Sequence, residues 1–194
     1  MSNWTRSILT YIDLIGVKDS AMAPDGRATD LMRRMHTLVS GKVSHGMPNH
    51  DHCYIWNDSV LLLAYLDLTP KGKKHEADVI KEADALKKDI DQICESYAIA
   101  VKGLVFPDEA IDHIDVFQRQ IADQPRVIKL KTSSYAMGNC FLIEKQLRHL
   151  KRHWYIDSRI AEHLSTDQAL TKHTVEMLPG NQPREVYVYS GYLW

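Results

Sequence analysis

The sequence has few cysteines, no long hydrophobic run and almost no net charge. Its three cysteines, Cys53, Cys94 and Cys140, are widely spaced and form no Cys-x-x-Cys pair. This pattern excludes a disulfide framework and a paired-cysteine zinc site, and it is typical of a reducing compartment. No apolar stretch reaches the roughly 20 residues that a membrane-spanning helix needs. The N-terminal apolar run is interrupted by Asp13, unlike that of a signal peptide. We therefore expect a cytoplasmic protein.

The composition is that of an ordinary globular chain. The formal net charge of −1 gives no overall field that attracts nucleic acid or a membrane surface. With 194 residues, 44% of them hydrophobic and 25% charged, the chain can bury a core without disulfides or metals. We find no internal repeat and no low-complexity linker, so a single domain over residues 1–194 is expected, with neither nucleic acid nor membrane as a partner.

The order of apolar segments predicts an α+β fold with a mostly antiparallel sheet and helices on one face. The pattern of apolar residues and turn formers defines the elements. In chain order, we expect a strand over 6–17, a helix over 26–40, a loop over 41–51, hairpin strands over 52–56 and 59–67, a helix over 73–95, a strand over 97–106, a helix over 108–122, a strand over 126–133, a helix over 138–152, a strand over 154–156, and hairpin strands over 174–178 and 185–189.

Two acidic residues stand at predicted turns. Asp13 lies near the end of the first strand, where an ionised carboxylate is costly unless a cation or hydrogen-bond donors compensate it. Asp58 lies in the hairpin turn, and the hairpin is expected to pair beside the first strand. Converging carboxylates suit Mg²⁺ or Mn²⁺ that is bound mainly through substrate phosphates. The alternative is ordinary turn chemistry, since Asn-Asp is common in hairpins and Asp often caps a turn.

Six segments, taken in order, resemble the catalytic domain of class III nucleotidyl cyclases over nearly the whole chain. They are YIDLIGV, YIWNDSVLLLAY, YAIAVKGLVF with Gly103, SYAMGNCFLIEKQLRHL with Gly138, HWYIDSRIAEHL and EMLPGNQPREVYVY. The resemblance implies a ferredoxin-like βαββαβ core followed by a C-terminal β-hairpin. It also implies a homodimer with active sites at the interface, each built from both subunits.

The resemblance assigns roles to residues around the acid pair. It implies that Asp13 and Asp58, with the Leu14 carbonyl, hold two Mn²⁺ or Mg²⁺ ions in each active site. Metals held there would activate the ribose 3′-hydroxyl and neutralise the triphosphate. Backbone N–H groups just after the first strand would bind phosphate oxygens, namely those of Ile15, Gly16 and Val17.

The sequence departs from purine cyclases at the two base-reading positions. The usual lysine, four residues before the second metal acid, is Tyr54, and the acid three residues before Gly138 is Tyr135. Two aromatic rings would shrink the base pocket and favour a pyrimidine. This pattern resembles the bacterial Pycsar cyclases, which convert UTP or CTP to the cyclic 3′,5′-monophosphate during phage infection. The cyclic nucleotide then signals to a separate effector.

The sequence also lacks the family's transition-state Asn and Arg, whose positions fall on Leu142 and Gln146. Lys145, Arg148 or Lys102 would have to replace them, or the domain is a catalytically inactive module that binds nucleotide or a partner. A third alternative is a dinucleotide synthase, although the hairpin lacks a GGDEF-type or GGDD motif. The sequence leaves these alternatives open.

Overall fold

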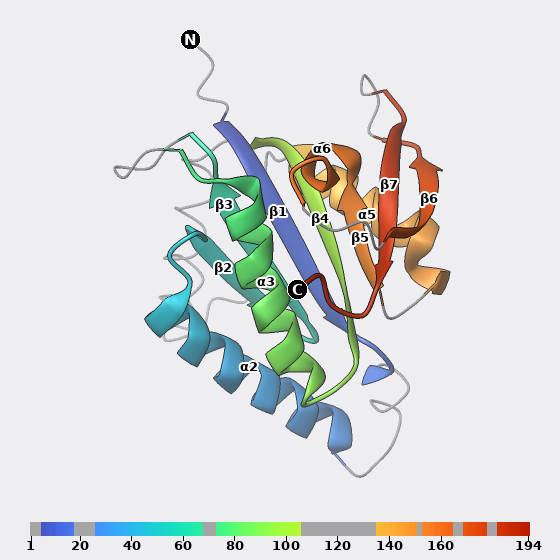
Figure 1. The fold of residues 1–194 in the computed structure, drawn as a ribbon. Helices are drawn as coiled ribbons and strands as arrows, with labels where there is room; N and C mark the ends of the chain where they lie inside the picture. The colour runs from blue at the N-terminus through green and yellow to red at the C-terminus, as the bar shows by residue number, and fades with distance from the viewer. Residues whose placement is uncertain are drawn as a thin grey trace, which may run out of the picture.

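The computed structural model describes residues 5–17, 26–67, 73–105, 135–150, 153–164, 169–177 and 182–194 (Figure 1). Its elements are β1 (Thr5–Leu14), α2 (Arg27–Gly46), β2 (His52–Trp56), β3 (Ser59–Tyr65), α3 (Glu76–Asp91), β4 (Ser96–Val105), α5 (Tyr135–Leu147), a 3₁₀ turn (Arg148–Leu150), β5 (His153–Asp157), α6 (Ser158–Ala161), β6 (Ala169–Val175) and β7 (Arg184–Ser190). The helix and strand expected over 108–122 and 126–133 lie outside the described residues.

One seven-stranded sheet organises the domain, in the order β2-β3-β1-β4-β5-β7-β6. Its first four strands, with α2 and α3 as connections, form the ferredoxin-like half of the sheet. All adjacent strands are antiparallel except β4 and β5, which are parallel. The α+β class, the mostly antiparallel sheet and the C-terminal hairpin of β6 and β7 are therefore confirmed.

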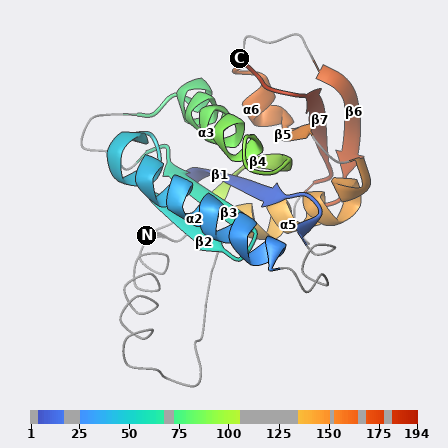
Figure 2. The same cartoon turned by 90° about the horizontal axis from the view of Figure 1, so that it is seen from below.

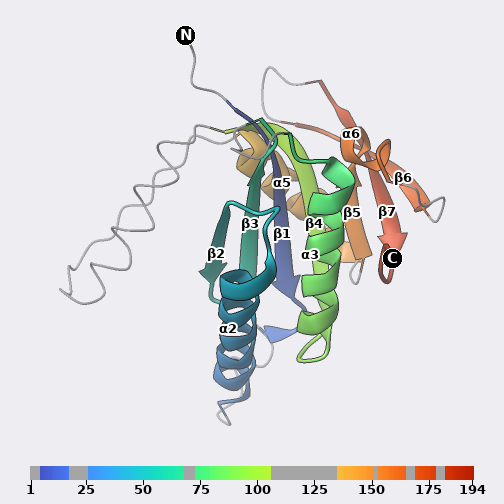
Figure 3. The ribbon, with the colours of Figure 1, turned by 60° about the vertical axis from the view of Figure 1, so that its left-hand side comes forward.

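Alternation along the strands builds a core on each face of the sheet. Ile8 and Ile12 of β1 point to the face covered by α2, α3 and α6, whereas Leu9 and Tyr11 point to the face covered by α5. Figures 2 and 3 show α2 and α3 on one side of the sheet and α5 on the other. The expectation of helices on one face is therefore correct for α2, α3 and α6. It is wrong for α5, which covers the other face.

Close packing of α5 on β4 requires a glycine. A Cβ atom at Gly103 would lie 2.8 Å from both Cα and Cβ of Ala136 in the first turn of α5. No side chain fits there without moving the helix away from the sheet. Gly103 therefore allows α5 to reach the sheet.

Two expected elements have wrong bounds: β6 spans Ala169–Val175 instead of 174–178, and α2 ends later than expected. Residues 41–46 were expected in a loop because they contain two glycines, yet the helix continues to Gly46. Val43 packs against the same core as Met35 and Val39, and this apolar contact extends the helix. None of the helices in the described ranges is long and apolar enough to cross a membrane.

Candidate active site

The strand register brings the two predicted acids together. Asp13 near the end of β1 lies opposite Ser59 of β3 on one side and Tyr97 of β4 on the other. Asp58 directly precedes Ser59, in a turn where Asn57 adopts a φ of 52°. The Leu14 N–H donates to the Asp58 carbonyl at 3.0 Å, which ties the turn to the end of β1.

Neutral hydroxyl groups hold the Asp13 carboxylate. Ser59 Oγ donates to Oδ1 at 2.6 Å, and the Tyr97 hydroxyl donates to Oδ2 at 2.8 Å. The Tyr11 hydroxyl lies 2.9 Å from Ser59 Oγ. Because the Ser59 hydrogen is used on Asp13, Tyr11 is the donor in that contact. Both carboxylate oxygens are therefore fixed in position, and their donors among the described residues are uncharged.

The surroundings disfavour the ionised form of Asp13. Burial raises the pKa of its carboxyl group above the usual range, and the nearby charge of Asp58 raises it further. The hydrogen bonds from Ser59 and Tyr97 oppose these effects only in part. In the described part of the chain, no lysine or arginine is paired with Asp13 or Asp58. Within the described residues, the negative charge of the site is therefore not neutralised by a side chain.

This donor set fits a divalent cation that is partly held by substrate. The Asp13 and Asp58 carboxylates and the Leu14 carbonyl offer oxygen only, the ligand type that Mg²⁺ and Mn²⁺ prefer. No cluster of three or more His, Cys, Asp or Glu side chains suited to a metal occurs among the described residues. Two carboxylates leave most of the coordination positions to water and phosphate, as is usual for Mg²⁺.

The segment after β1 meets the phosphate-binding expectation only in part. The Ile15 N–H donates to the Glu95 carbonyl at 2.7 Å, so the expectation that it binds phosphate is wrong. Gly16 is exposed and makes the turn with a φ of 81°, a conformation that favours glycine. Val17 begins a helical turn and its side chain is buried. The N–H groups of Gly16 and Val17 remain candidates.

The two tyrosines at the base-reading positions have different environments. Tyr54 is half-buried on β2, opposite Leu61 of β3, and burial raises the pKa of its hydroxyl to about 12. Tyr135 begins α5 with 44% of its surface exposed. Neither ring lines the cavity beside Asp58.

The structure places the three candidate cations, Lys102, Arg148 and Lys145, in different surroundings. Lys102 projects to the α3 face of the sheet, away from Asp13, and pairs with Glu76 at 2.6 Å. It cannot serve this site. Arg148 lies 3.5 Å from Glu144, whose Oε1 is 3.2 Å from the Tyr97 hydroxyl oxygen. Three contacts, through Glu144 and Tyr97, therefore connect Arg148 to Asp13.

Lys145 and the residues at the transition-state positions lie along the same helix. Lys145 is exposed, and the structure gives it no contact with the acid pair. The Gln146 side chain donates to the carbonyls of Leu142 and Glu176, each at 3.1 Å, so its amide is engaged in the fold. Of Lys145 on α5 and Arg148 in the 3₁₀ turn that follows it, Arg148 is the one linked to the site by described contacts.

Sequence reasoning missed the side chains that surround Asp13: Tyr11, Ser59, Tyr97 and Glu144. The β1 register with its two neighbours would have identified Ser59 and Tyr97, because they are the direct antiparallel partners of Asp13. Glu144 reaches the site from α5, and a helix placed on this face was not expected.

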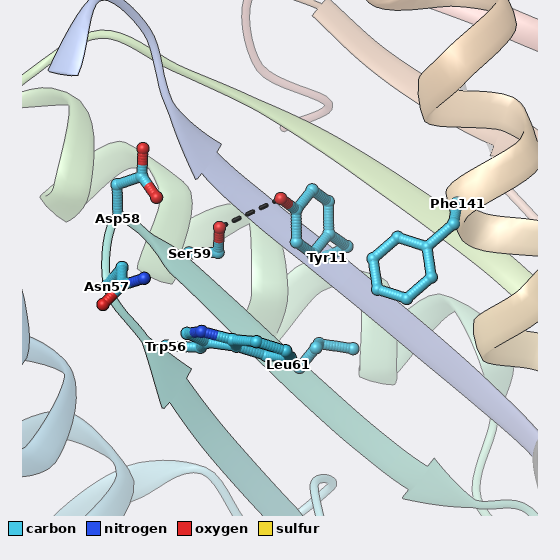
Figure 4. Close-up of a pocket in the computed structure, with 7 residues that line it drawn as sticks. All are labelled: Tyr11, Trp56, Asn57, Asp58, Ser59, Leu61 and Phe141. Atoms are coloured by element: carbon cyan, nitrogen blue, oxygen red, sulfur yellow. Dashed lines mark hydrogen bonds between the residues drawn. The ribbon is translucent and has the colours of Figure 1, made fainter. Parts of the chain in front are cut away.

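A cavity of about 190 Å³ opens beside the acid pair. Its lining joins the hairpin turn to the face covered by α5, and consists of Tyr11, Trp56, Asn57, Asp58, Ser59, Leu61 and Phe141 (Figure 4). Asp58 and Ser59 stand at one end and Phe141 at the other, with Trp56 and Leu61 along one side. Polar and aromatic groups therefore share one hollow.

No protein-family model matches the chain, and a search of curated proteins finds no match. Solved structures are similar in fold. A bacterial light-regulated adenylyl cyclase gives a TM-score of 0.59 at 11% identity, over 95% of this chain and 89% of that one. The adenylyl cyclase CyaB from P. aeruginosa gives 0.57 at 9% identity, over 95% and 93%. The guanylyl cyclase Cya2 gives 0.55 at 10% identity, over 97% and 93%. The chain therefore has the fold of a nucleotidyl cyclase domain.

Proposed function

We propose that the protein is a pyrimidine nucleotide cyclase, which converts UTP or CTP to 3′,5′-cyclic UMP or CMP and pyrophosphate. The observation that carries this proposal is the convergence of Asp13 and Asp58 at one end of β1 in a cyclase-type fold, with no neutralising side chain among the described residues. Acids that served only the fold would be expected to have a cationic partner.

The reaction needs positioning and charge neutralisation more than protein functional groups. The ribose 3′-oxygen forms a bond to the α-phosphorus, the bond to the pyrophosphate oxygen breaks, and the 3′-hydroxyl proton is released. A divalent cation held by Asp13, Asp58 and the Leu14 carbonyl would acidify that hydroxyl and neutralise the phosphates. Ser59 and Tyr97 fix the Asp13 carboxylate for this task, and the N–H groups of Gly16 and Val17 would hold phosphate oxygens.

Substrate choice and biological role rest on sequence features. Tyr54 and Tyr135 replace the polar pair that reads a purine, which favours uracil or cytosine. The likeness to Pycsar cyclases supports a cytoplasmic homodimer whose product is a second messenger in antiphage defence, read by a separate effector. In such a dimer, hydrogen bonds to the base from one subunit would complete the metal site of the other.

A second function is favoured by a specific observation. Leu142 and Gln146 stand where cyclases carry Asn and Arg, and the Gln146 amide is engaged by backbone carbonyls. A catalytically inactive module that binds nucleotide or a partner would tolerate this change. The exposed Arg148 near Glu144 is the candidate replacement cation if the domain is active.

Product analysis separates these functions. The purified chain is incubated with each of the four ribonucleoside triphosphates and Mn²⁺, beside an Asp58→Asn control, and products are resolved by chromatography and mass spectrometry. Cyclic UMP or CMP that is absent from the control supports the proposal. Cyclic AMP or GMP would contradict the pyrimidine assignment, dinucleotides would identify a synthase, and no product would favour the inactive module.

A further inference from the structure

Two large aromatic rings beside the acid pair are exposed to solvent. Trp56, the last residue of β2, has 55% of its surface exposed, and Phe141 of α5 has 41%. Both line the cavity next to Asp58. Exposed rings that gather at one hollow differ from isolated surface aromatics, because a ligand can bury them together.

The walls of this cavity are held in place. The Phe141 ring packs edge-on against Tyr11, with ring centroids 6.0 Å apart and planes at 73°. Tyr11 is in turn fixed by Ser59, the residue that donates to Asp13. Trp56 directly precedes the Asn57-Asp58 turn. The aromatic end of the cavity and the acidic end therefore belong to one connected arrangement.

The size and chemistry of the cavity restrict its occupant. Drug-sized ligands occupy pockets of roughly 300–1,000 Å³, so about 190 Å³ suits one planar ring better than a whole nucleotide. Apolar aromatic faces favour stacking of a flat heterocycle. The carboxylate end favours a cation-bound phosphate. A molecule with both parts, a single ring joined to phosphates, matches the two ends.

We infer that this cavity binds the pyrimidine ring of the substrate, stacked on Trp56 and bounded by Phe141, while the phosphates extend towards Asp13 and Asp58. This inference rests on the proposed function and names the ring-stacking residues of that site. It differs from the role given to Tyr54 and Tyr135, which do not line the cavity. Stacking supplies affinity, and hydrogen bonds from other residues would choose between bases.

Binding of a triphosphate that cannot cyclise tests the inference without relying on turnover. The α,β-methylene analogues of UTP and CTP are titrated with Mn²⁺ into the full chain by calorimetry. Trp56→Leu removes the flat ring, Trp56→Phe keeps an aromatic face, and Trp194→Leu removes another exposed indole outside the cavity as a matched control. Sedimentation of each variant reports its assembly state.

We expect Trp56→Leu to weaken binding about tenfold, in line with the loss of one base–aromatic stack. Trp56→Phe should stay within about threefold of wild type, and Trp194→Leu should be unchanged. If wild type binds and Trp56→Leu binds equally well, the stacking assignment is overturned while the proposed function survives. Weakened binding with a smaller sedimenting species would assign Trp56 to a subunit contact and also overturn it. If wild type binds neither analogue, both proposals fail.

Discussion

The fold treats two carboxylates at strand ends, the buried Asp157 and the half-buried Asp13, in opposite ways. Asp157 at the end of β5 is fully buried and pairs with Arg159 at 2.8 Å and with Arg184 at 3.0 Å. It also accepts the Arg159 backbone N–H at 3.1 Å and so caps α6. Among the described residues, Asp13 receives hydrogen bonds from neutral hydroxyl groups, and it lies near a second carboxylate, Asp58.

This difference separates a structural acid from a candidate functional one. The charge of Asp157 is neutralised within the chain, so its removal should affect folding. The charge of Asp13 is left for a ligand to neutralise, so its removal should affect binding and turnover. Each prediction below tests one side of this contrast.

The largest expected effect is on activity at the acid pair. Asp13→Ala or Asp58→Ala should abolish cyclase turnover, because each removes half of the carboxylates available to a cation. The unfolding free energy, measured by urea denaturation, should not fall in Asp58→Ala. Full activity in either variant would show that the pair does not hold the catalytic metals.

For Asp157→Asn, the main expected effect is on stability. Neutralising this residue leaves the guanidinium groups of Arg159 and Arg184 without their carboxylate, and the unfolding free energy should fall by about 3 kcal/mol. Chemical denaturation measures the loss. An Asp157→Asn protein that is as stable as wild type would remove the distinction between the two acids.

A smaller effect is expected when one hydroxyl donor to Asp13 is lost. Tyr97→Phe removes the hydrogen bond to Asp13 Oδ2 and the contact with Glu144. A hydrogen bond to a charged group contributes about 1.5–3 kcal/mol, so the Mn²⁺ concentration for half-maximal activity should rise roughly tenfold or more. The control is Tyr155→Phe, which alters another buried tyrosine of the same sheet face. Equal metal dependence in the two variants would show that Tyr97 does not position Asp13.

The smallest expected effect is on the pH dependence of stability without metal. Because the pKa of Asp13 is raised in the folded protein, the folded state holds its proton more tightly than the unfolded state does. The contribution of Asp13 to the unfolding free energy should therefore decline as pH rises from its ordinary pKa through its raised value. Asp13→Asn should lack this decline when denaturation is followed across the same pH range. An identical pH profile in the variant would show that Asp13 is not destabilised by its surroundings.

Much of the fold could be predicted from sequence because apolar runs marked β1, β3 and β4, and apolar residues at helical spacing marked α3. The end of α2 could not be predicted, because Gly41 and Gly46 indicated a loop. Only the packing of Val43 on the core extends the helix. The face of the sheet that α5 covers could not be predicted either. It depends on the close approach at Gly103, which is a tertiary contact.

The acid pair was accessible from sequence because both residues stand at recognisable turns. The surroundings of the acid pair could not be predicted from sequence. The hydroxyl donors depend on strand register, and Glu144 depends on the placement of α5. The sequence also suggested that the Ile15 N–H binds phosphate, whereas it donates to the Glu95 carbonyl. Lys102 appeared near the site along the chain, yet strand alternation puts its side chain on the opposite face.

The central claim is that Asp13 and Asp58 hold a divalent cation together with substrate phosphate. Electron paramagnetic resonance of Mn²⁺ measures this directly, because bound and free ion give different spectra. Wild type should bind Mn²⁺ more tightly when the α,β-methylene analogue of UTP or CTP is present, and Asp58→Asn should lose this gain while remaining folded. Equal Mn²⁺ binding by wild type and Asp58→Asn with either analogue would contradict the account.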